Sequence, residues 1–227
     1  MLPSLLHDLH DVDDAAEDDA RAMLMQIATL FALSVMVQAQ EAERPSADAW
    51  PDLAPVLVRN VNTGAEAQIR LYGSDGAIDE DALDEFARVV AQDDADAPVS
   101  LSPRLVQLAI KAAYHFHAPT LVSISAYRPQ NPFKGSRHAT GDALDFQLDG
   151  VKAPVLAAYL QKYALVGVGL YTHPRTQYVH LDVRDESYHW IDGSPPGVTW
   201  REQPLRDPFR MMRDASYSPE LDLPLGK

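Results

Sequence analysis

Cysteine is absent from all 227 residues of this chain. Its absence excludes a disulfide framework, a zinc site built from thiolates, a cysteine nucleophile and a lipid anchor attached through cysteine. It is also in keeping with passage through an oxidising compartment, although many cytosolic proteins lack cysteine too. A metal site in this chain would have to use histidine and carboxylate ligands.

Positive charge is scarce. The chain has 19 Lys and Arg residues against 33 Asp and Glu residues, and its formal net charge is −14. Such a surface repels phosphate backbones, so nucleic acid is not an expected partner. The apolar fraction of 46% and the charged fraction of 23% are ordinary for a folded domain, and a chain of this length can bury one sizeable core.

Long apolar runs are also lacking, because no run reaches the roughly 20 residues that span a membrane as a helix. The longest is the segment 22–37, whose length suits the core of a signal peptide or a short anchor. Val37 and Ala39 supply the small residues of a cleavage site after Ala39. We predict an export signal, and with it a location in the periplasm or cell envelope. An uncleaved anchor, the only expected membrane contact, and a helix buried in the domain are the alternatives.

The flank of this segment departs from an export signal, which should begin with basic residues. Residues 8–19 instead hold seven acids among twelve positions, and we expect them to form a solvated tail. A true start at Met23 or Met25 would remove the acidic flank without supplying a basic one.

The chain divides into three parts by composition. Residues 1–55 hold the acidic start, the apolar segment and a polar linker that contains proline. Residues 56–192 carry the alternating and helical patterns of a folded domain. Residues 193–227 are rich in Pro and Arg, and we expect this tail to wrap the domain or to stay loose.

The domain is predicted to be α+β, with helices packed on a small, mostly antiparallel sheet. Apolar residues with helical spacing predict helices: 80–92, capped by Asp79, 103–117, begun by Ser102 and Pro103, and 154–163. Alternating apolar residues predict strands: 56–61, 67–72, 121–126, 144–148, 166–171 and 178–183. His115 and His117 lie two residues apart on a helix and point different ways, so we expect surface positions for them.

Two of these strands carry chemically active side chains on the face away from the core. In the strand 178–183 the apolar Val179 and Leu181 share one face, so His180 and Asp182 share the other. In the strand 144–148 the same alternation directs Asp145 away from the core. If these strands are neighbours, Asp145 and His180 meet over one cleft.

His138 would reach this cleft from the loop that precedes the strand 144–148, and Gly141 could make the tight turn between them. His138, Asp145 and His180 then form a three-ligand set for one divalent ion, and Zn²⁺ is the expected metal. Three protein ligands leave the fourth tetrahedral position open for water, which is typical of a catalytic site. Spacing alone also allows ordinary hydrogen-bonded histidines and a surface carboxylate.

The motif Ser136-x-His138-x-x-Gly141-x-Ala143-x-Asp145, followed by His180-x-Asp182, resembles the zinc D-alanyl-D-alanine metallopeptidases. The similarity is greatest to their branch of K-type bacterial murein endopeptidases. It extends in order over residues 56–192, through the segments 60–64, 125–129, 166–171, 178–182 and 189–190. The resemblance implies the hedgehog/DD-peptidase fold, the zinc ligands His138, Asp145 and His180, and the cross-link peptides of peptidoglycan as substrate.

Three further residues are candidates for the chemistry. Arg128 offers a fixed positive charge for a developing oxyanion or a substrate carboxylate, with a surface salt bridge as its alternative role. Ser136 could hydrogen-bond a ligand or the substrate, or it could only stabilise a turn. Tyr178 is a further candidate for substrate binding.

The general base is not identified by the sequence. Carboxypeptidase relatives place a Glu three residues before the last ligand and others a His two before it, but this chain has Gln177 and Tyr178 there. Asp182 could accept the proton of the water, or it could only orient His180. His189 is a further option, because a position just after the strand would suit the rim of the cleft.

Three functions are therefore open. The first is a zinc peptidase that cuts peptidoglycan cross-links. The second is a zinc-containing module that binds murein or a protein without cutting it. The third is a D-alanyl-D-alanine carboxypeptidase, which the missing Glu at position 177 disfavours.

Overall fold

The computed structural model describes residues 53–92, 101–129, 135–198 and 202–224. The predicted acidic stretch, the apolar segment with its cleavage site and most of the linker lie outside the described residues. Within the four described ranges, no helix is long and apolar enough to cross a membrane.

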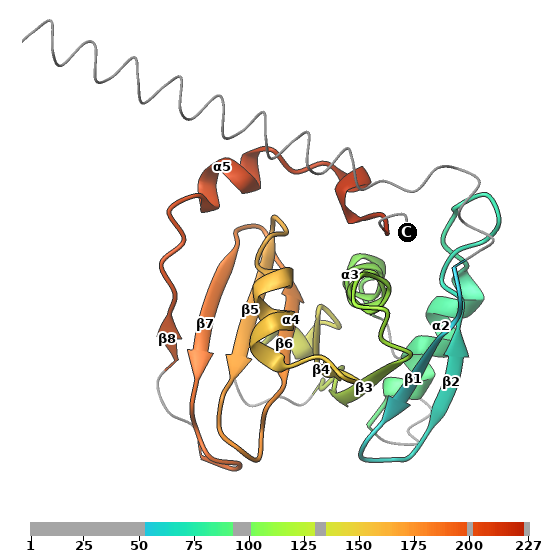
Figure 1. The fold of residues 1–227 in the computed structure, drawn as a ribbon, viewed down its shortest axis with the longest axis horizontal. Coiled ribbons are helices and arrows are strands. Elements are labelled where there is room, and N and C mark those ends of the chain that lie inside the picture. Colours follow the sequence, from blue (N-terminus) through green and yellow to red (C-terminus); the bar gives the residue numbers. More distant parts are fainter. Residues whose placement is uncertain (1–52, 93–100, 130–134, 199–201, 225–227) are drawn as a thin grey trace, which may run out of the picture. The chain divides into compact units, whose positions relative to one another are not determined.

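An eight-stranded mixed sheet is the frame of the domain (Figure 1). Its strands run in the spatial order β2-β1-β3-β4-β6-β5-β7-β8, and neighbours are antiparallel except for the pairs β1–β3 and β5–β7. The strands are β1 Val56–Asn60, β2 Glu66–Ile69, β3 Thr120–Ser125, β4 Ala143–Leu148, β5 Val166–Tyr171, β6 Val179–Val183, β7 Tyr188–Asp192 and β8 Gln203–Pro204. The predicted α+β class is confirmed. The sheet is larger than expected because β7 and β8, which were not predicted, extend it.

Three helices cover one face of this sheet: α2 Glu80–Val90, α3 Pro103–His115 and α4 Ala153–Leu160. The alternation of the strands supplies the core beneath them, with Leu144 and Phe146 of β4 and Val179 and Leu181 of β6 all buried. The opposite sheet face is left to the polar side chains of the same strands. This division of the two faces follows the predicted pattern.

The ends of the two longer helices differ in how they are capped. Asp79 accepts a hydrogen bond from the backbone N–H of Ala82 at 3.1 Å, so its predicted cap on α2 is confirmed. Ser102 is the N-cap residue of α3 and Pro103 its first residue, as predicted, but the Ser102 side chain makes no capping hydrogen bond. Its backbone N–H instead donates to the carbonyl of Gly141 at 2.9 Å, which ties the start of α3 to the loop before β4.

The C-terminal residues wrap the domain. From β8 they continue through helix α5 Arg210–Ala215 to the 3-10 helix η3 Pro219–Asp222, which packs against α3 (Figure 1). Asp222 of η3 is buried and accepts from Arg104 of α3 at 2.7 Å. Asp214 of α5 accepts from the backbone N–H groups of Leu165 at 3.0 Å and Ser187 at 2.8 Å. The sequence allowed a tail that wraps the domain or a loose tail, and these contacts show that the described part of the tail wraps the domain.

Candidate metal centre

His138, Asp145 and His180 come together on the sheet face that the helices leave uncovered. Strands β4 and β6 are antiparallel neighbours, and Asp145 lies directly opposite His180 in their register. His138 arrives from the 3-10 helix η2 Arg137–Ala139. Gly141, with a φ of +77°, makes the turn that returns the chain to β4. The predicted meeting of the three residues is confirmed.

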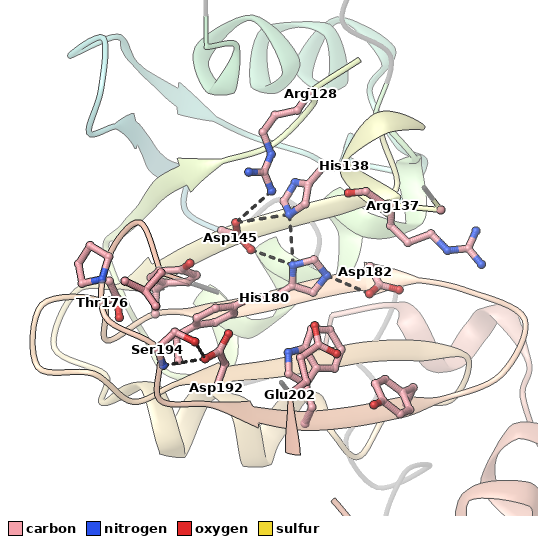
Figure 2. A pocket seen from close by; sticks show the side chains of 18 of the residues that line it. Arg128, Arg137, His138, Asp145, Thr176, His180, Asp182, Asp192, Ser194 and Glu202 are labelled. Atoms are coloured by element: carbon pink, nitrogen blue, oxygen red, sulfur yellow. Dashed lines mark hydrogen bonds and ion pairs between the residues drawn. The ribbon is translucent and has the colours of Figure 1, made fainter. Parts of the chain in front are cut away.

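The three side chains are nearly inaccessible to solvent and converge closely (Figure 2). Nδ1 of His180 lies 2.8 Å from Oδ1 of Asp145 and 3.2 Å from Nε2 of His138. Nε2 of His138 is 3.4 Å from Oδ2 of Asp145. One donor atom from each residue falls within 4.8 Å of the others, so the group could hold a metal ion.

The hydrogen bonds on the far side of each ring determine which nitrogen faces the centre. Nδ1 of His138 lies 2.6 Å from the carbonyl oxygen of Ala126. A carbonyl only accepts, so this nitrogen carries the proton and Nε2 presents a lone pair. Nε2 of His180 lies 2.9 Å from a carboxylate oxygen of Asp182, which leaves Nδ1 of His180 to face His138 and Asp145. Two imidazole nitrogens and a carboxylate directed at one point are a suitable donor set for Zn²⁺.

Asp182 is completely buried, and both of its carboxylate oxygens have hydrogen-bond partners. Arg184 donates from Nε to its Oδ1 at 2.6 Å, and a second guanidinium nitrogen of Arg184 donates to Oδ2. Burial acts to raise the pKa of Asp182, but the hydrogen bonds from His180 and Arg184 hold it below its usual value. Asp182 is therefore a carboxylate anchored between an arginine and the outer nitrogen of His180.

The charges of His180 and Asp145 depend on their neighbours in the centre. Burial would lower the pKa of His180, but hydrogen bonds to Asp145 and Asp182 outweigh it and raise that pKa to about 9. Burial likewise acts to raise the pKa of Asp145, and His138 and His180 hold it far below its ordinary value. The two carboxylates thus favour a positive charge between them, which either a proton or a metal ion can supply.

A cleft of about 760 Å³ opens over the centre. Figure 2 shows Arg128 and Arg137 on one side of the three residues, and Asp192, Ser194 and Glu202 on the other. Arg128 lies with Nη2 3.8 Å from Oδ2 of Asp145, and its side chain is 40% exposed. It can therefore turn toward a negatively charged group in the cleft.

The other predicted substrate residues also line this cleft. Tyr178 stacks on Tyr171 with ring centroids 4.4 Å apart, and burial and the charge of Asp145 raise the pKa of its hydroxyl. The Tyr178 hydroxyl therefore keeps its proton and can donate a hydrogen bond. Ser136 lines the cleft at the start of η2, where its side chain makes no helix cap.

Two glycines of β5 make the close packing of the centre possible. A Cβ atom at Gly169 would lie 2.5 Å from Cε2 of Trp190, and one at Gly167 would lie 2.2 Å from Oδ2 of Asp182. Trp190 in turn packs beside His180, with ring centroids 5.1 Å apart. Glycines two residues apart on a strand indicate that other side chains pack closely against that face. The sequence does not say which side chains these are.

His189 lies on the other face of the sheet, and its expected place at the cleft rim is wrong. Strand alternation sends its neighbours Tyr188 and Trp190 into the cleft and directs His189 to the C-terminal tail. Its Nε2 lies 3.3 Å from Arg213 and 3.5 Å from a carboxylate oxygen of Asp207. It cannot act as a base at the centre.

Sequence reasoning missed several residues around the centre: Ala126, Tyr171, Arg184, Asp192 and Glu202. The carbonyl of Ala126 carried no signal, since any residue could supply it. Arg184 lies two positions after Asp182, and that spacing could have placed it on the same strand face. Glu202 comes from the tail, for which no element was predicted.

The α+β domain thus carries, beneath a polar cleft, a buried His-Asp-His group that could hold a metal ion. Residues 51–190 match the family model described as Peptidoglycan L,D-endopeptidase MepK, in the M15 peptidase class. The chain belongs to this family, so the resemblance to the zinc D-alanyl-D-alanine peptidases and their K-type murein endopeptidase branch is confirmed. Neither the search of curated proteins nor that of solved structures returned a match.

Proposed function

We propose that the protein is a zinc-dependent endopeptidase that hydrolyses peptide cross-links of bacterial peptidoglycan. One ion would be held by Nε2 of His138, a carboxylate oxygen of Asp145 and Nδ1 of His180. The observation that carries the proposal is the direction of these donor atoms. Hydrogen bonds to Ala126 and Asp182 tie the outer nitrogen of each ring, so the inner atoms converge on a single point beside Asp145.

Zinc bound there would supply Lewis acidity, which activates water and polarises a carbonyl. The side chains of the cleft would hold the substrate. Arg128 would face negative charge that develops on the substrate, since only a distant contact to Asp145 engages its Nη2. Tyr178 would donate a hydrogen bond from its protonated hydroxyl.

Asp182 would orient His180 instead of accepting a proton from water. Both of its carboxylate oxygens are bonded by Arg184, and it is completely buried. An outer carboxylate of this kind fixes the tautomer of a metal-binding histidine and raises its basicity. Of the two roles that the sequence allowed for Asp182, accepting a proton and orienting His180, this geometry supports the second.

The family description supports L,D bonds as the cleaved linkage. A peptidoglycan substrate lies outside the cytoplasm, so this function requires export. The apolar segment 22–37 is the candidate signal for it. N-terminal sequencing of the mature protein would test this: a new N-terminus after Ala39 is expected, and an intact Met1 in the cytosol would overturn the export proposal.

The function is tested by digesting purified murein sacculi with the zinc-loaded protein, with and without a chelator. We expect loss of dimeric muropeptides that stops when the metal is removed and returns when zinc is added back. His138→Ala should abolish both zinc binding and cleavage. His115→Ala is the matched control, because His115 lies exposed on α3 and takes no part in the centre.

The same digest separates the alternatives. Release of terminal D-alanine without loss of dimers would identify a carboxypeptidase. Stoichiometric zinc with unchanged muropeptides would identify a binding module. Absence of zinc from the purified wild-type protein, even after incubation with the metal, would overturn the proposed centre itself.

A further inference from the structure

The C-terminal tail supplies one wall of the cleft. The family model ends at residue 190, and several residues beyond that point line the cavity: Asp192, Ser194, Val198, Glu202 and Pro204. This wall therefore belongs to the part of the chain that the family match does not cover. Properties that it gives the cleft need not be shared by other members of the family.

Strand β8 fixes the wall against the domain. Trp190 lies opposite Pro204 and Ile191 opposite Gln203 in the antiparallel pair β7–β8. The backbone N–H of Leu205 donates to the carbonyl of His189 at 2.8 Å and continues this ladder. Because side chains alternate along a strand, Glu202 shares the face of Pro204, which is the face of Trp190 and the cleft.

The cleft is electrically polarised. Arg128 and Arg137 lie on one side of the candidate metal centre, and Asp192 and Glu202 on the other (Figure 2). Arg184 also lines the cleft, but its guanidinium is paired with the buried Asp182. A ligand that spans the cleft therefore meets positive charge at one end and negative charge at the other.

The two acids of the negative end differ in their availability. Asp192 is 8% exposed, and it accepts from the backbone N–H of Ser194 at 2.7 Å and from the Ser194 hydroxyl. Glu202 is exposed, and no ion pair joins it to another residue in the described part of the chain. Partial burial raises the pKa of Glu202, and the charge of Asp192 adds to that rise. A cation brought in by a ligand would stabilise the charged form of Glu202 and so offset the effects of burial and of Asp192.

We propose that Glu202 is a specificity-determining residue that contacts a protonated amine of the substrate, on the side of the cleft opposite Arg128. The inference rests on the proposed function and adds a substrate class to it: cross-link peptides with a free amine on that side. A carboxylate in a partly enclosed cleft, beside a second fixed negative charge, attracts an ammonium group and gains little from a neutral amide.

The test uses the full-length, zinc-loaded protein and two matched cross-link peptides. One peptide carries a free side-chain amine, and in the other the same amine is acetylated. Fluorescence anisotropy of labelled peptides measures binding, and chromatography of the same mixtures measures cleavage. The proteins compared are the wild type, Glu202→Gln and the control Glu66→Gln, whose exposed carboxylate lies on β2 at the far end of the sheet.

We expect the wild type and Glu66→Gln to bind the free-amine peptide about tenfold more tightly than the acetylated one. Glu202→Gln should lose this preference while its affinity for the acetylated peptide stays the same. Equal binding of both peptides by the wild type would overturn the proposal, and so would an unchanged preference in Glu202→Gln. Equal slowing of cleavage of both peptides, with the binding preference kept, would instead assign Glu202 to proton transfer and also overturn it.

The binding measurement stands apart from the proposed activity. A preference for the amine that depends on Glu202, without any cleavage by the wild type, would support the amine contact and contradict the peptidase. Cleavage of both peptides at equal rates and with equal affinity would support the peptidase and contradict the amine contact.

Discussion

Nε2 of His180 lies 2.9 Å from a carboxylate oxygen of Asp182, and this contact directs the other nitrogen of the ring to His138 and Asp145. Arg184 holds the same carboxylate from its far side. Arg184, Asp182 and His180 thus form a chain of contacts that leads from the edge of the cleft to the candidate metal centre. The geometry of the centre depends on residues that cannot themselves reach a metal ion.

Asp182→Asn should weaken zinc binding without abolishing it. The neutral amide attracts the proton on Nε2 of His180 less strongly than the carboxylate, so the preference for the tautomer that offers Nδ1 is weakened. We expect zinc affinity to fall about 10- to 100-fold, as for other outer partners of metal-binding histidines. Competition with a chromogenic chelator measures this. Asp149→Asn, at an exposed position after β4, should leave the affinity unchanged; wild-type affinity in Asp182→Asn would contradict the orienting role.

Gly169→Ala should disturb the packing of Trp190 against His180. The new Cβ would lie 2.5 Å from the indole ring, which is too close for any carbon contact, so the ring or the strand must move. We expect a loss of about 1–3 kcal/mol in the free energy of unfolding, measured by urea denaturation, together with a shift in tryptophan emission.

Gly73→Ala is the control for this change. A Cβ there would lie 3.0 Å from Oδ1 of Asp75 and at an ordinary 3.8 Å from the carbonyl oxygen of Ala77, and Gly73 has no positive φ. The change therefore costs at most the hydrogen bond that Asp75 accepts from the backbone N–H of Ala77. An unfolding free energy of Gly169→Ala equal to that of the wild type would show that β5 tolerates a methyl group beside Trp190.

His189 should make the stability of the domain fall on acidification. Burial and the charge of Arg213 lower its pKa to about 4, against the raising effect of Asp207. An unfolded histidine has a pKa of about 6.5, so between pH 6.5 and pH 4 the unfolded chain binds the proton and the folded one does not. Stability that is present above pH 6.5 is therefore lost as the pH falls through this range, by roughly 3 kcal/mol at most.

Urea denaturation between pH 4 and pH 7 measures this effect. His189→Gln cannot titrate, so its unfolding free energy should depend less on pH in this window than that of the wild type. Val155→Gln changes an exposed residue that does not titrate, so it should keep the wild-type dependence. Parallel pH curves for wild type and His189→Gln would show that His189 titrates normally in the folded protein.

Asp222→Ala should release the end of the tail. The change leaves Arg104 without the partner that its Nε meets at 2.7 Å, at a site where Asp222 is almost completely buried. Removal of one member of a buried ion pair costs about 3 kcal/mol. We expect lower unfolding free energy and faster tryptic cleavage within residues 206–213. Glu220→Ala, on the exposed side of η3, is the control, and equal cleavage of both variants would contradict the anchoring role.

The alternation of β4 and β6 made much of the centre predictable. Leu144, Phe146, Val179 and Leu181 identify the buried faces of the two strands, and this places Asp145 and His180 on the opposite face. Side chains alternate strictly along a strand, so this part of the arrangement needs no knowledge of distant contacts.

Side-chain alternation could not predict which face His189 occupies, because the strand that contains it was not recognised from the sequence. Nothing in the sequence around residues 188–192 marked a strand, and β7 exists through its parallel pairing with β5. Once that pairing is present, Trp190 faces the cleft and His189 faces Arg213. The tail was missed for a related reason, since β8 has two residues and α5 has six, too few for a periodic pattern.

The sequence by itself determined which face of each strand is polar, and its motifs identified the family to which the chain belongs. The pairing of β4 with β6, which brings Asp145 opposite His180, came from the tertiary structure. Only the tertiary structure decided which nitrogen of each histidine faces the centre, how Asp182 is held, and that the tail forms a wall of the cleft. The polar faces follow from side-chain alternation within single strands, and the family follows from residues at fixed spacing along the chain. What the tertiary structure decided depends on contacts between residues far apart in the chain, such as His138 with Ala126 and the β7–β8 pair, which no local pattern encodes.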